Sequence, residues 1–185
     1  VTSTTGNIID VGLFTAAGVA MTGAATGATA LTGGAGADTI IGGSLVDTII
    51  GGAGADVITP AAGNDILTYL LTADLFTGGF MVDSIVGATG DTDVISVGTS
   101  GTTFAIANGD DWARSAGVEN ITAVANTAAV TIDLAASAET AGIVAVDLSA
   151  GTSTTGNIID VGLFAANGVA MTGAATGATA LTGGA

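Results

Sequence analysis

The sequence feature that most constrains the fold is a series of aspartates spaced nine residues apart in the first half of the chain. The segment GGAGADTIIGGSLVDTIIGGAGADVIT, residues 33–59, shows the unit most clearly. In each unit a turn, usually rich in glycine, leads to an aspartate, and a trio of mainly β-branched residues follows. Glycine permits the backbone angles of tight turns, and such a trio suits a very short strand whose central residue points inward. The series has six members: Asp38, Asp47, Asp56, Asp65, Asp74 and Asp83.

Two such turns and two such strands make one coil of 18 residues, so every second aspartate is expected to stack in a column. The two expected columns are Asp38, Asp56 and Asp74 on one edge and Asp47, Asp65 and Asp83 on the other. Stacked coils lie about 4.8 Å apart, and carboxylates at that distance repel one another. Calcium binds about six to eight oxygens from carboxylates and backbone carbonyls, whereas magnesium requires a stricter octahedron. The spacing therefore predicts calcium ions between successive coils.

The units GGAGADTII and GGAGADVIT resemble the calcium-binding nonapeptide repeats of RTX proteins. The resemblance covers residues 33–68 well and residues 69–93 loosely. It implies a parallel β-roll with calcium in the turns on both edges, secretion by a type I system, and folding triggered by extracellular calcium. It also implies that backbone carbonyls of the turns assist the aspartates as ligands. The expected metal ligands are Asp38, Asp47, Asp56, Asp65 and Asp83.

A second and much longer repeat is visible at the two ends of the chain. Residues 1–35 return as residues 151–185, with differences only at Val1/Gly151, Thr15/Ala165 and Ala17/Asn167. Identity this high indicates duplication of a 150-residue unit, so we interpret the chain as a window in a tandem array. We expect the parent sequence to continue after Ala185 with something close to GADTIIGG. The expected domains are 1–32 as the end of one repeat, 33–97 as the β-roll with degenerate coils, 98–150 as its solenoid continuation, and 151–185 as the start of the next copy.

The second half of the chain predicts further coils of the same kind. Residues 135–142 (AASAETAG) suit a helical turn. Strand signals recur at 119–124, 129–134, 143–149, 156–162, 168–172 and 177–182. The simplest continuous structure is all-β in class: a right-handed parallel β-solenoid that contains the RTX-like calcium β-roll, with at most short helical insertions.

Two segments depart from the nine-residue pattern. Residues 66–76 (ILTYLLTADLF) favour a short helix or bulky coil over a degenerate coil whose strand is LLT. A helix there would have one apolar face, formed by Leu67, Leu70, Leu71 and Leu75. In GATGDTDVISV, residues 87–97, Asp91 and Asp93 lie close together. They either bind a further calcium ion or simply cap the turn, and both interpretations stay open.

The segment NGDDWARSAG, residues 108–117, holds the only Trp and the only Arg of the chain. We expect Asp110 to cap a helical turn and Arg114 to pair with a nearby carboxylate. Trp112 is expected to cover the edge of the core. An exposed Trp112 at a contact between subunits is the alternative.

The composition narrows the possible functions. The chain has 16 acidic residues, one Arg and no Lys, His or Cys, for a net charge of −15. This charge opposes binding to nucleic acid or to an anionic membrane surface, and it favours cations. No apolar run approaches the roughly 18–20 residues of a membrane span. Because His, Cys and Lys are missing and no known catalytic motif is present, we expect no enzyme activity.

The expected function is structural: a calcium-stabilised, self-assembling tandem-repeat solenoid that forms an extracellular fibre, S-layer or adhesin shaft on a bacterial surface. Residues 117–122 (GVENIT) and the strands after them also resemble repeat regions of large S-layer and adhesin-like proteins. The expected partners are calcium ions, further copies of the chain, and a cell-surface glycan or lipopolysaccharide, with no nucleic acid and no membrane insertion. The alternative is an RTX secretion and folding module of a larger secreted toxin or hydrolase.

Overall fold

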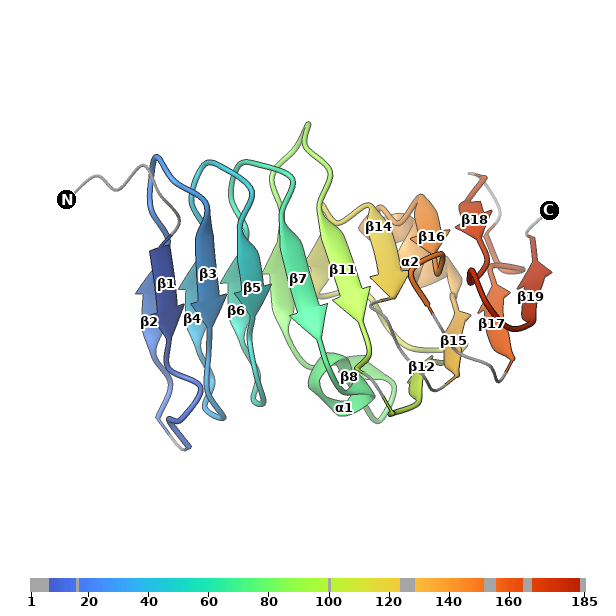
Figure 1. The fold of residues 1–185 in the computed structure, drawn as a ribbon, viewed down its shortest axis with the longest axis horizontal. Coiled ribbons are helices and arrows are strands. Elements are labelled where there is room, and N and C mark those ends of the chain that lie inside the picture. The colour runs from blue at the N-terminus through green and yellow to red at the C-terminus, as the bar shows by residue number, and fades with distance from the viewer. Residues whose placement is uncertain are drawn as a thin grey trace.

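The computed structural model describes residues 7–15, 17–99, 101–123, 129–151, 156–164 and 168–183. Within these residues the chain winds into a stack of short strands, with β1 at one end and the last strands at the other (Figure 1). Three of the residues at which the duplicated segments differ, Val1, Ala165 and Asn167, lie outside the described residues.

Three sheets of parallel strands run along the stack. The first sheet contains β1 (Asn7–Asp10), β3 (Thr29–Thr32), β5 (Thr48–Ile50), β7 (Ile66–Tyr69), β11 (Val94–Val97), β14 (Asn120–Ala123), β16 (Ala145–Asp147) and β18 (Ala170–Thr172). The second sheet contains β2 (Ala20–Thr22), β4 (Thr39–Ile41), β6 (Val57–Thr59), β10 (Ser84–Val86) and β13 (Ser115–Ala116). The third sheet contains β12 (Phe104–Ile106), β15 (Val130–Asp133), β17 (Asn157–Asp160) and β19 (Thr179–Thr182).

Only short elements interrupt this pattern among the described residues. They are the helices α1 (Thr72–Leu75) and α2 (Ala136–Ala141) and the antiparallel pair β8 (Phe76–Thr77) and β9 (Phe80–Met81). The all-β parallel solenoid with short helical insertions is therefore confirmed, as are the short helix within 66–76 and the helical turn within 135–142. The single leucine face predicted for 66–76 is wrong, because Leu67 lies in strand β7 while Leu70 and Leu71 are exposed.

The core consists of ladders in which the same position of each coil points inward. One ladder in the first sheet runs Ile9, Leu31, Ile49, Leu67, Ile95, Ile121, Val146 and Met171. Its counterpart in the second sheet runs Met21, Ile40, Ile58 and Ile85. The central residues of the predicted trios, Ile40, Ile49 and Ile58, are all buried, which confirms their inward direction. Each coil thus buries its apolar residues only when another coil stacks on it.

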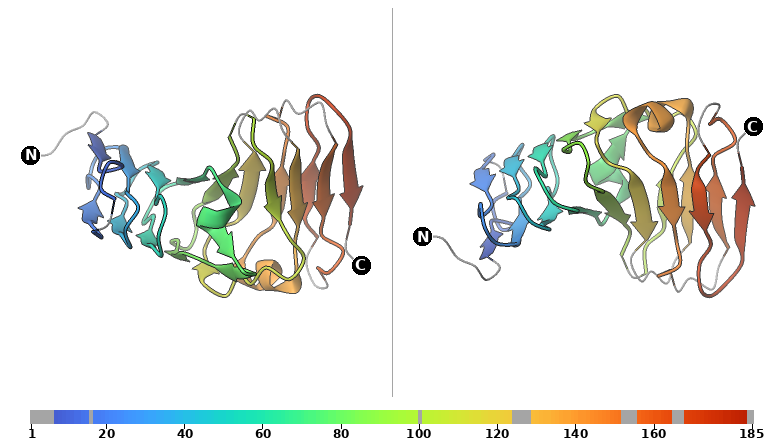
Figure 2. Two further views of the ribbon diagram at one scale, coloured as in Figure 1. Left: turned by 90° about the horizontal axis from the view of Figure 1, so that it is seen from below. Right: turned by 90° about the horizontal axis from the view of Figure 1, so that it is seen from above.

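The length of a coil changes along the stack. Stacked residues are 18 apart between Asp38 and Asp56, as the nine-residue spacing predicts. The next coil takes 27 residues, because α1 and the pair β8–β9 are inserted between β7 and β10. Figure 2 shows the result: the stack is narrow near the N-terminus and broad beyond the insertion. We call residues 7–69 the narrow roll and residues 94–160 the broad half.

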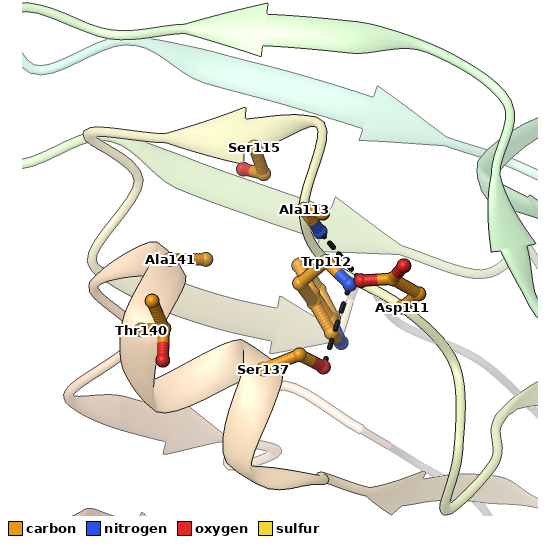
Figure 3. Close-up of a pocket in the computed structure, with 7 residues that line it drawn as sticks. All are labelled: Asp111, Trp112, Ala113, Ser115, Ser137, Thr140 and Ala141. Carbon is orange, nitrogen blue, oxygen red and sulfur yellow. Dashed lines mark hydrogen bonds between the residues drawn. The ribbon is translucent and has the colours of Figure 1, made fainter.

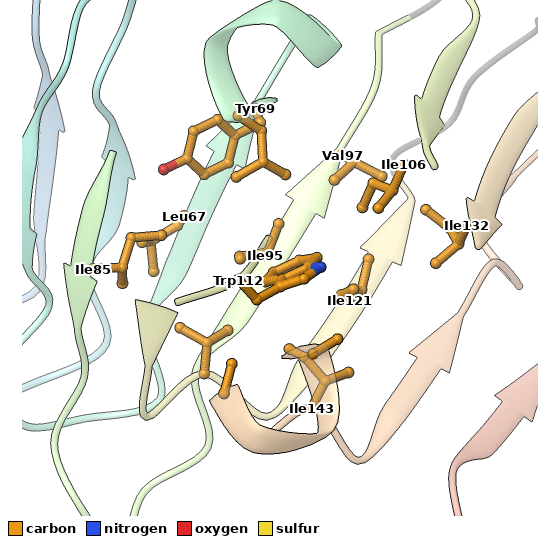
Figure 4. Close-up of a cluster of buried hydrophobic side chains, with 14 of the residues drawn as sticks. Leu67, Tyr69, Ile85, Ile95, Val97, Ile106, Trp112, Ile121, Ile132 and Ile143 are labelled. Carbon is orange, nitrogen blue, oxygen red and sulfur yellow. The ribbon is translucent and has the colours of Figure 1, made fainter. Parts of the chain in front are cut away.

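The broad half has the third sheet as an additional face and fills its wider interior with aromatic side chains. Trp112 is fully buried and packs edge-on against Phe76, with ring centroids 5.1 Å apart. Figure 4 shows Trp112 among the inward isoleucines of neighbouring strands, including Ile95 and Ile121. The alternative of an exposed Trp112 at a subunit contact is therefore wrong. Trp112 stabilises the core at the point where the stack widens.

The rest of segment 108–117 ties this coil to α2 across a cavity of about 210 Å³. The hydroxyl of Ser137 accepts the backbone N–H of Trp112 at 3.4 Å and donates to the carbonyl of Asp110 at 3.1 Å (Figure 3 shows the first of these bonds). Asp110 caps no helix; its Oδ2 accepts the N–H of Ala107 at 2.8 Å. Arg114 is exposed and has no ion pair with any described residue, so the predicted pairing is wrong there.

The two copies of the duplicated segment form the same strands but join different sheets. In the first copy, β1 and β3 lie in the first sheet and β2 in the second. In the second copy, the equivalent β17 and β19 lie in the third sheet and β18 in the first. The coils between the copies have strands on three faces. When the coils have two faces again, these are the third and first sheets instead of the first and second. Among the described strands, β19 pairs on one side only, which leaves Leu181 49% exposed while the equivalent Leu31 is 1% exposed.

Candidate metal centre

Buried aspartates line the two edges at which the first and second sheets meet. Each lies at the end of a turn, immediately before a strand. Six of them are at most 1% exposed: Asp38, Asp47, Asp56, Asp65, Asp83 and Asp93. We call the turns that lead from the first sheet to the second the first edge, and those that lead back the second edge. The first edge holds Asp38, Asp56 and Asp83, and the second holds Asp47, Asp65 and Asp93.

Hydrogen bonds join the aspartates of each edge into a ladder. On the first edge, the N–H of Asp38 donates to Oδ1 of Asp56 at 2.8 Å, and the N–H of Asp56 donates to Oδ1 of Asp83 at 2.8 Å. The second edge repeats this arrangement at 2.7 and 2.9 Å along Asp47, Asp65 and Asp93. One oxygen of each carboxylate thus fixes one coil to the next, which a charged acceptor does more strongly than a neutral one.

The predicted columns are correct for their first two members and wrong for the third. Asp74 lies in α1, outside both ladders, because the inserted elements lengthen that coil to 27 residues. Asp83 therefore stacks on Asp56 at the first edge instead of on Asp65 at the second. The length of 27 is three times nine, so the aspartate spacing in the sequence continues unchanged through a coil whose path is different.

Two acidic residues outside the nine-residue series extend the second edge. Asp93 follows Asp65 after 28 residues. Glu119 follows after another 26, and its Oε2 accepts the N–H of Asp93 at 2.9 Å. The regular spacing misses both residues because neither separation is a multiple of nine. The turn sequence GATGDTD was the available signal for Asp93, whereas nothing around Glu119 resembles a repeat unit.

The second oxygen of each carboxylate shows where a cation can bind. Oδ2 of Asp38 accepts the N–H of Gly34 at 2.8 Å, and Oδ2 of Asp47 accepts the N–H of Gly43. The equivalent oxygen is buried and has no hydrogen-bond partner in three residues: Asp56, Asp65 and Asp93. A buried, unpartnered carboxylate oxygen is costly unless a cation or a proton meets it. These oxygens are the observation that favours a metal at the edges.

Asp83 differs from Asp56 and Asp65 because its second oxygen has a partner. Its Oδ2 accepts the hydroxyl of Tyr69 at 2.8 Å, and Tyr69 is itself buried. Burial, and then the neighbouring carboxylate, raise the pKa of Tyr69, so the phenol keeps its proton and remains a donor. Both oxygens of Asp83 thus have partners within the protein.

In two of the turns, the first glycine lets a carboxylate and the backbone of the next coil come close together. A Cβ on Gly33 would lie 2.1 Å from the carbonyl oxygen of Gly51 in the next coil and 2.5 Å from Oδ2 of Asp38. A Cβ on Gly42 would lie 1.9 Å from the carbonyl oxygen of Pro60 and 2.9 Å from Oδ2 of Asp47. Carboxylate and carbonyl oxygens of successive coils therefore converge beside the glycine Cα, where no side chain would fit. Glycine is required here by close approach rather than by turn conformation alone.

The chain supplies almost no positive charge to these buried carboxylates. Its one basic residue, Arg114, is exposed. Burial is the main cause that raises the pKa of Asp56 and Asp65 to about 6 and that of Asp83 and Asp93 to about 7, with neighbouring carboxylates adding to the shift. Such groups either take up a proton or need a cation from solution. A divalent cation at the edges offsets both burial and repulsion.

The available donors fit calcium. No group of three or more acidic side chains that could hold a metal occurs in the part of the chain that the structure describes. The sequence has no His or Cys. A cation at the edges would therefore take carboxylate oxygen from an edge aspartate and complete its shell with backbone carbonyls, such as those of Gly51 and Pro60, and with water. Calcium accepts mixed oxygen shells of this kind, whereas transition metals favour nitrogen and sulfur ligands.

Comparison with known protein families agrees with this arrangement. The family of RTX calcium-binding nonapeptide repeats (four copies) matches residues 26–44 and 32–67. RTX nonapeptide repeats bind calcium ions and are typical of secreted proteins, and the matched residues include the first four predicted ligands. Comparisons with curated proteins and with solved structures found no match. Neither described helix is long and apolar enough to cross a membrane.

Replacing Asp56 with alanine is expected to destabilise the calcium-loaded protein much more than replacing Asp74. Asp56→Ala removes a proposed calcium ligand and leaves the buried N–H of Asp38 without its acceptor, which alone costs about 1–3 kcal/mol. Asp74→Ala, outside both ladders, is expected to change the free energy of unfolding by about 0.5 kcal/mol or less. Thermal unfolding of both variants in excess calcium measures the difference. Equal losses would contradict the assignment of the edges.

Replacing Ala61 with glycine is expected to stabilise the second edge. Ala61 stands where the intact turn 51–56 has Gly52, and it adopts a positive φ of 76°. This conformation is unfavourable by about 1–2 kcal/mol for a residue with a side chain. Replacement by glycine removes that cost, but glycine also raises the entropy of the unfolded chain, which offsets part of the gain. Ala61→Gly should therefore raise the free energy of unfolding in calcium by about 0.5–1 kcal/mol in denaturant titrations. Ala62→Gly, at a neighbour outside the positive-φ region, is the control, and an equal gain there would contradict the explanation.

Proposed function

We propose that this chain, which carries RTX-type calcium-binding repeats over residues 26–67, is a structural segment of a secreted tandem-repeat protein. Calcium ions stiffen its narrow roll, and the stacked coils form the shaft of a cell-surface fibre, layer or adhesin. The segment acts by holding a shape and a length and performs no catalysis.

The linear stack combined with the duplicated segment is the observation that carries this proposal. β1 and β18 are the outermost strands of a sheet that continues through the whole stack. The second copy of the segment folds again into three strands in the same order, at the opposite end from the first (Figure 1). Its last strand has an unpaired edge among the described strands, and Leu181 on that strand is exposed. The equivalent Leu31 in the first copy is buried under the next coil. A further narrow roll stacked there would extend the shaft without a linker.

Because the second copy joins different sheets from the first, a regular array would also turn about its long axis. The roll of one copy is formed by the first and second sheets, and the roll of the next would continue the third and first. The calcium-binding edges of successive copies would therefore face different directions around the shaft. Another copy of the chain, a glycan or lipopolysaccharide could then bind to surfaces that repeat around the shaft.

An array of three 150-residue copies, compared with the 185-residue chain, tests the proposal. Negative-stain electron microscopy and small-angle X-ray scattering in calcium are expected to show a rod that lengthens by a constant increment for each copy. The same array with Asp56→Ala in every copy is the matched control and should be more flexible. Compact particles whose dimensions do not grow linearly with copy number would reject the shaft.

The alternative is a secretion and folding module of a larger secreted toxin or hydrolase. The family match covers only the calcium-binding roll, as it would if the roll were the secretion and folding module of a larger protein. The parent gene separates the two functions: several consecutive 150-residue copies support the shaft, whereas a single copy beside a catalytic domain supports the module.

A further inference from the structure

We propose that the turn at residues 87–93 binds a further calcium ion together with the turn at residues 117–119. This site lies outside the residues that match the repeat family, and the nine-residue spacing does not predict it. It would extend the second edge by one ion, into the region where the stack broadens.

The backbone places this turn in the same register as the matched turns. The first glycine of a matched turn donates its N–H to the residue that precedes the next turn on the same edge: Gly33 to Ile50 and Gly42 to Thr59, each at 2.8 Å. Gly87 donates to Ala116 at 2.8 Å in the same way. Gly117 thus takes the position that Gly51 and Pro60 occupy in the matched turns.

The close approach at Gly87 repeats that at Gly33 and Gly42 in the matched turns. A Cβ on Gly87 would lie 1.9 Å from the carbonyl oxygen of Gly117 in the next coil and 2.6 Å from Oδ2 of Asp93. The matched turns give 2.1 and 2.5 Å at Gly33, and 1.9 and 2.9 Å at Gly42. A carboxylate oxygen and a carbonyl oxygen of the following coil therefore converge here as they do in the RTX-type turns.

The carboxylate at this turn has an oxygen available for a cation. Asp93 is fully buried; its Oδ1 accepts the N–H of Asp65 at 2.9 Å, and its Oδ2 has no partner. Asp91 shows the same division: Oδ2 accepts the N–H of Gly63 at 3.2 Å, and the buried Oδ1 has no partner. Capping the turn uses only one oxygen of each aspartate and gives the second buried oxygen no partner. The unpartnered oxygens favour the metal-binding interpretation of the two that the sequence left open.

The local excess of negative charge also favours a bound cation at this turn. Asp91 and Glu119 both interact electrostatically with Asp93, and the Oε2 of Glu119 accepts the backbone N–H of Asp93 at 2.9 Å. These side chains alone do not form a metal-holding group among the described residues, so backbone carbonyls such as that of Gly117 would complete the shell. The only basic side chain of the protein, Arg114, lies nearby in sequence but is exposed and forms no ion pair with the described residues. The neutralising charge must therefore come from solution. Carboxylate and backbone carbonyl oxygens are the donors that calcium accepts.

Counting the calcium ions bound to the folded 185-residue chain tests this site. Native mass spectrometry and calorimetric titration with CaCl₂ are expected to show one ion fewer for Asp93→Asn than for the unchanged chain. The amide keeps an oxygen that can accept the N–H of Asp65, so the variant retains the coil-to-coil hydrogen bond. Asp147→Asn is the matched control, because Asp147 caps the N–H of Ser149 at 2.8 Å in a turn far from the site, and its ion count should not change.

The same variant separates a metal ligand from a turn cap. Without calcium, Asp93→Asn should be at least as stable as the unchanged chain, because it removes a buried charge; with calcium it should be less stable. Equal ion counts, or equal destabilisation in both conditions, would overturn the site. If Asp93→Asn does not fold, the half-buried Asp91→Asn should weaken one site about tenfold, and unchanged affinities would overturn the proposal. Absence of any bound calcium in the unchanged chain would instead contradict the RTX-type sites on which the proposed function rests.

Discussion

Transfer of the calcium-loaded chain into calcium-free buffer is expected to unfold the narrow roll, with a large loss of the strand signal in circular dichroism. Each coil of the roll buries little more than one isoleucine or leucine per face, while its turns bury carboxylates that have no partner cation. Without the metal, repulsion and burial of these charges oppose a fold that has only a thin apolar core. The free energy of calcium binding is then part of the free energy of folding.

The loss is expected to be uneven along the stack. The broad half buries Phe104 and Trp112 in addition to its aliphatic ladders, so it depends less on calcium. Hydrogen exchange followed by mass spectrometry should therefore show that amides of β3 to β6 lose protection, while those of β14 to β16 keep it longer.

Two measurements complete this prediction. Adding calcium back should restore both the strand signal and the protection, whereas an equal concentration of magnesium should not, because it requires a stricter coordination geometry. An unchanged spectrum after complete calcium removal would contradict calcium-dependent folding of the roll. Uniform loss of protection over the whole chain would contradict the separate contribution of the broad half.

Without calcium, the folded form is expected to gain stability relative to the unfolded form as the pH falls from 8 to 5, so strands of the roll that are lost at neutral pH should partly return. This is the opposite of ordinary acid denaturation. Burial raises the folded-state pKa of Asp56 and Asp65 to about 6 and of Asp83 and Asp93 to about 7, above the value of about 4 for an unfolded aspartate. Between these values the folded state binds more protons than the unfolded state. The resulting stability is complete below about pH 4 and is lost as the pH rises through 6 to 7.

Circular dichroism of calcium-stripped protein from pH 8 to pH 5, followed by thermal unfolding wherever the strand signal is present, measures this effect. The expected rise in Tm between pH 8 and pH 5 is on the order of 5 °C or more. In excess calcium the dependence should reverse, because protons then compete with the metal for the same carboxylates. Asp56→Asn combined with Asp93→Asn removes two of the titrating groups and should flatten the calcium-free profile. A calcium-free Tm that falls steadily from pH 8 to pH 5 would contradict the prediction.

The candidate site was predictable where the chain repeats and unpredictable where it does not. Asp38, Asp47, Asp56 and Asp65 follow from the spacing, because within the narrow roll every coil has the same length. Beyond the narrow roll, the spacing in the sequence no longer predicts which residues stack. The inserted α1 and β8–β9 put Asp74 outside the ladders, and the coil of 27 residues places Asp83 on the first edge. The places of Asp93 and Glu119 depend on coils of 28 and 26 residues.

The sequence by itself determined the elements: short strands centred on an inward aliphatic residue, glycine turns that end in an aspartate, and a fold class that needs neighbouring coils to bury its core. These are local properties, since a strand trio or a tight turn depends on a few adjacent residues. Only the tertiary structure decided which coils stack on which. Stacking depends on the path length between strands and on the number of faces in each coil. For that reason nearly identical segments at 7–32 and 157–182 form the same strands in different sheets, and aspartates in one regular series lie in two unequal ladders or in neither.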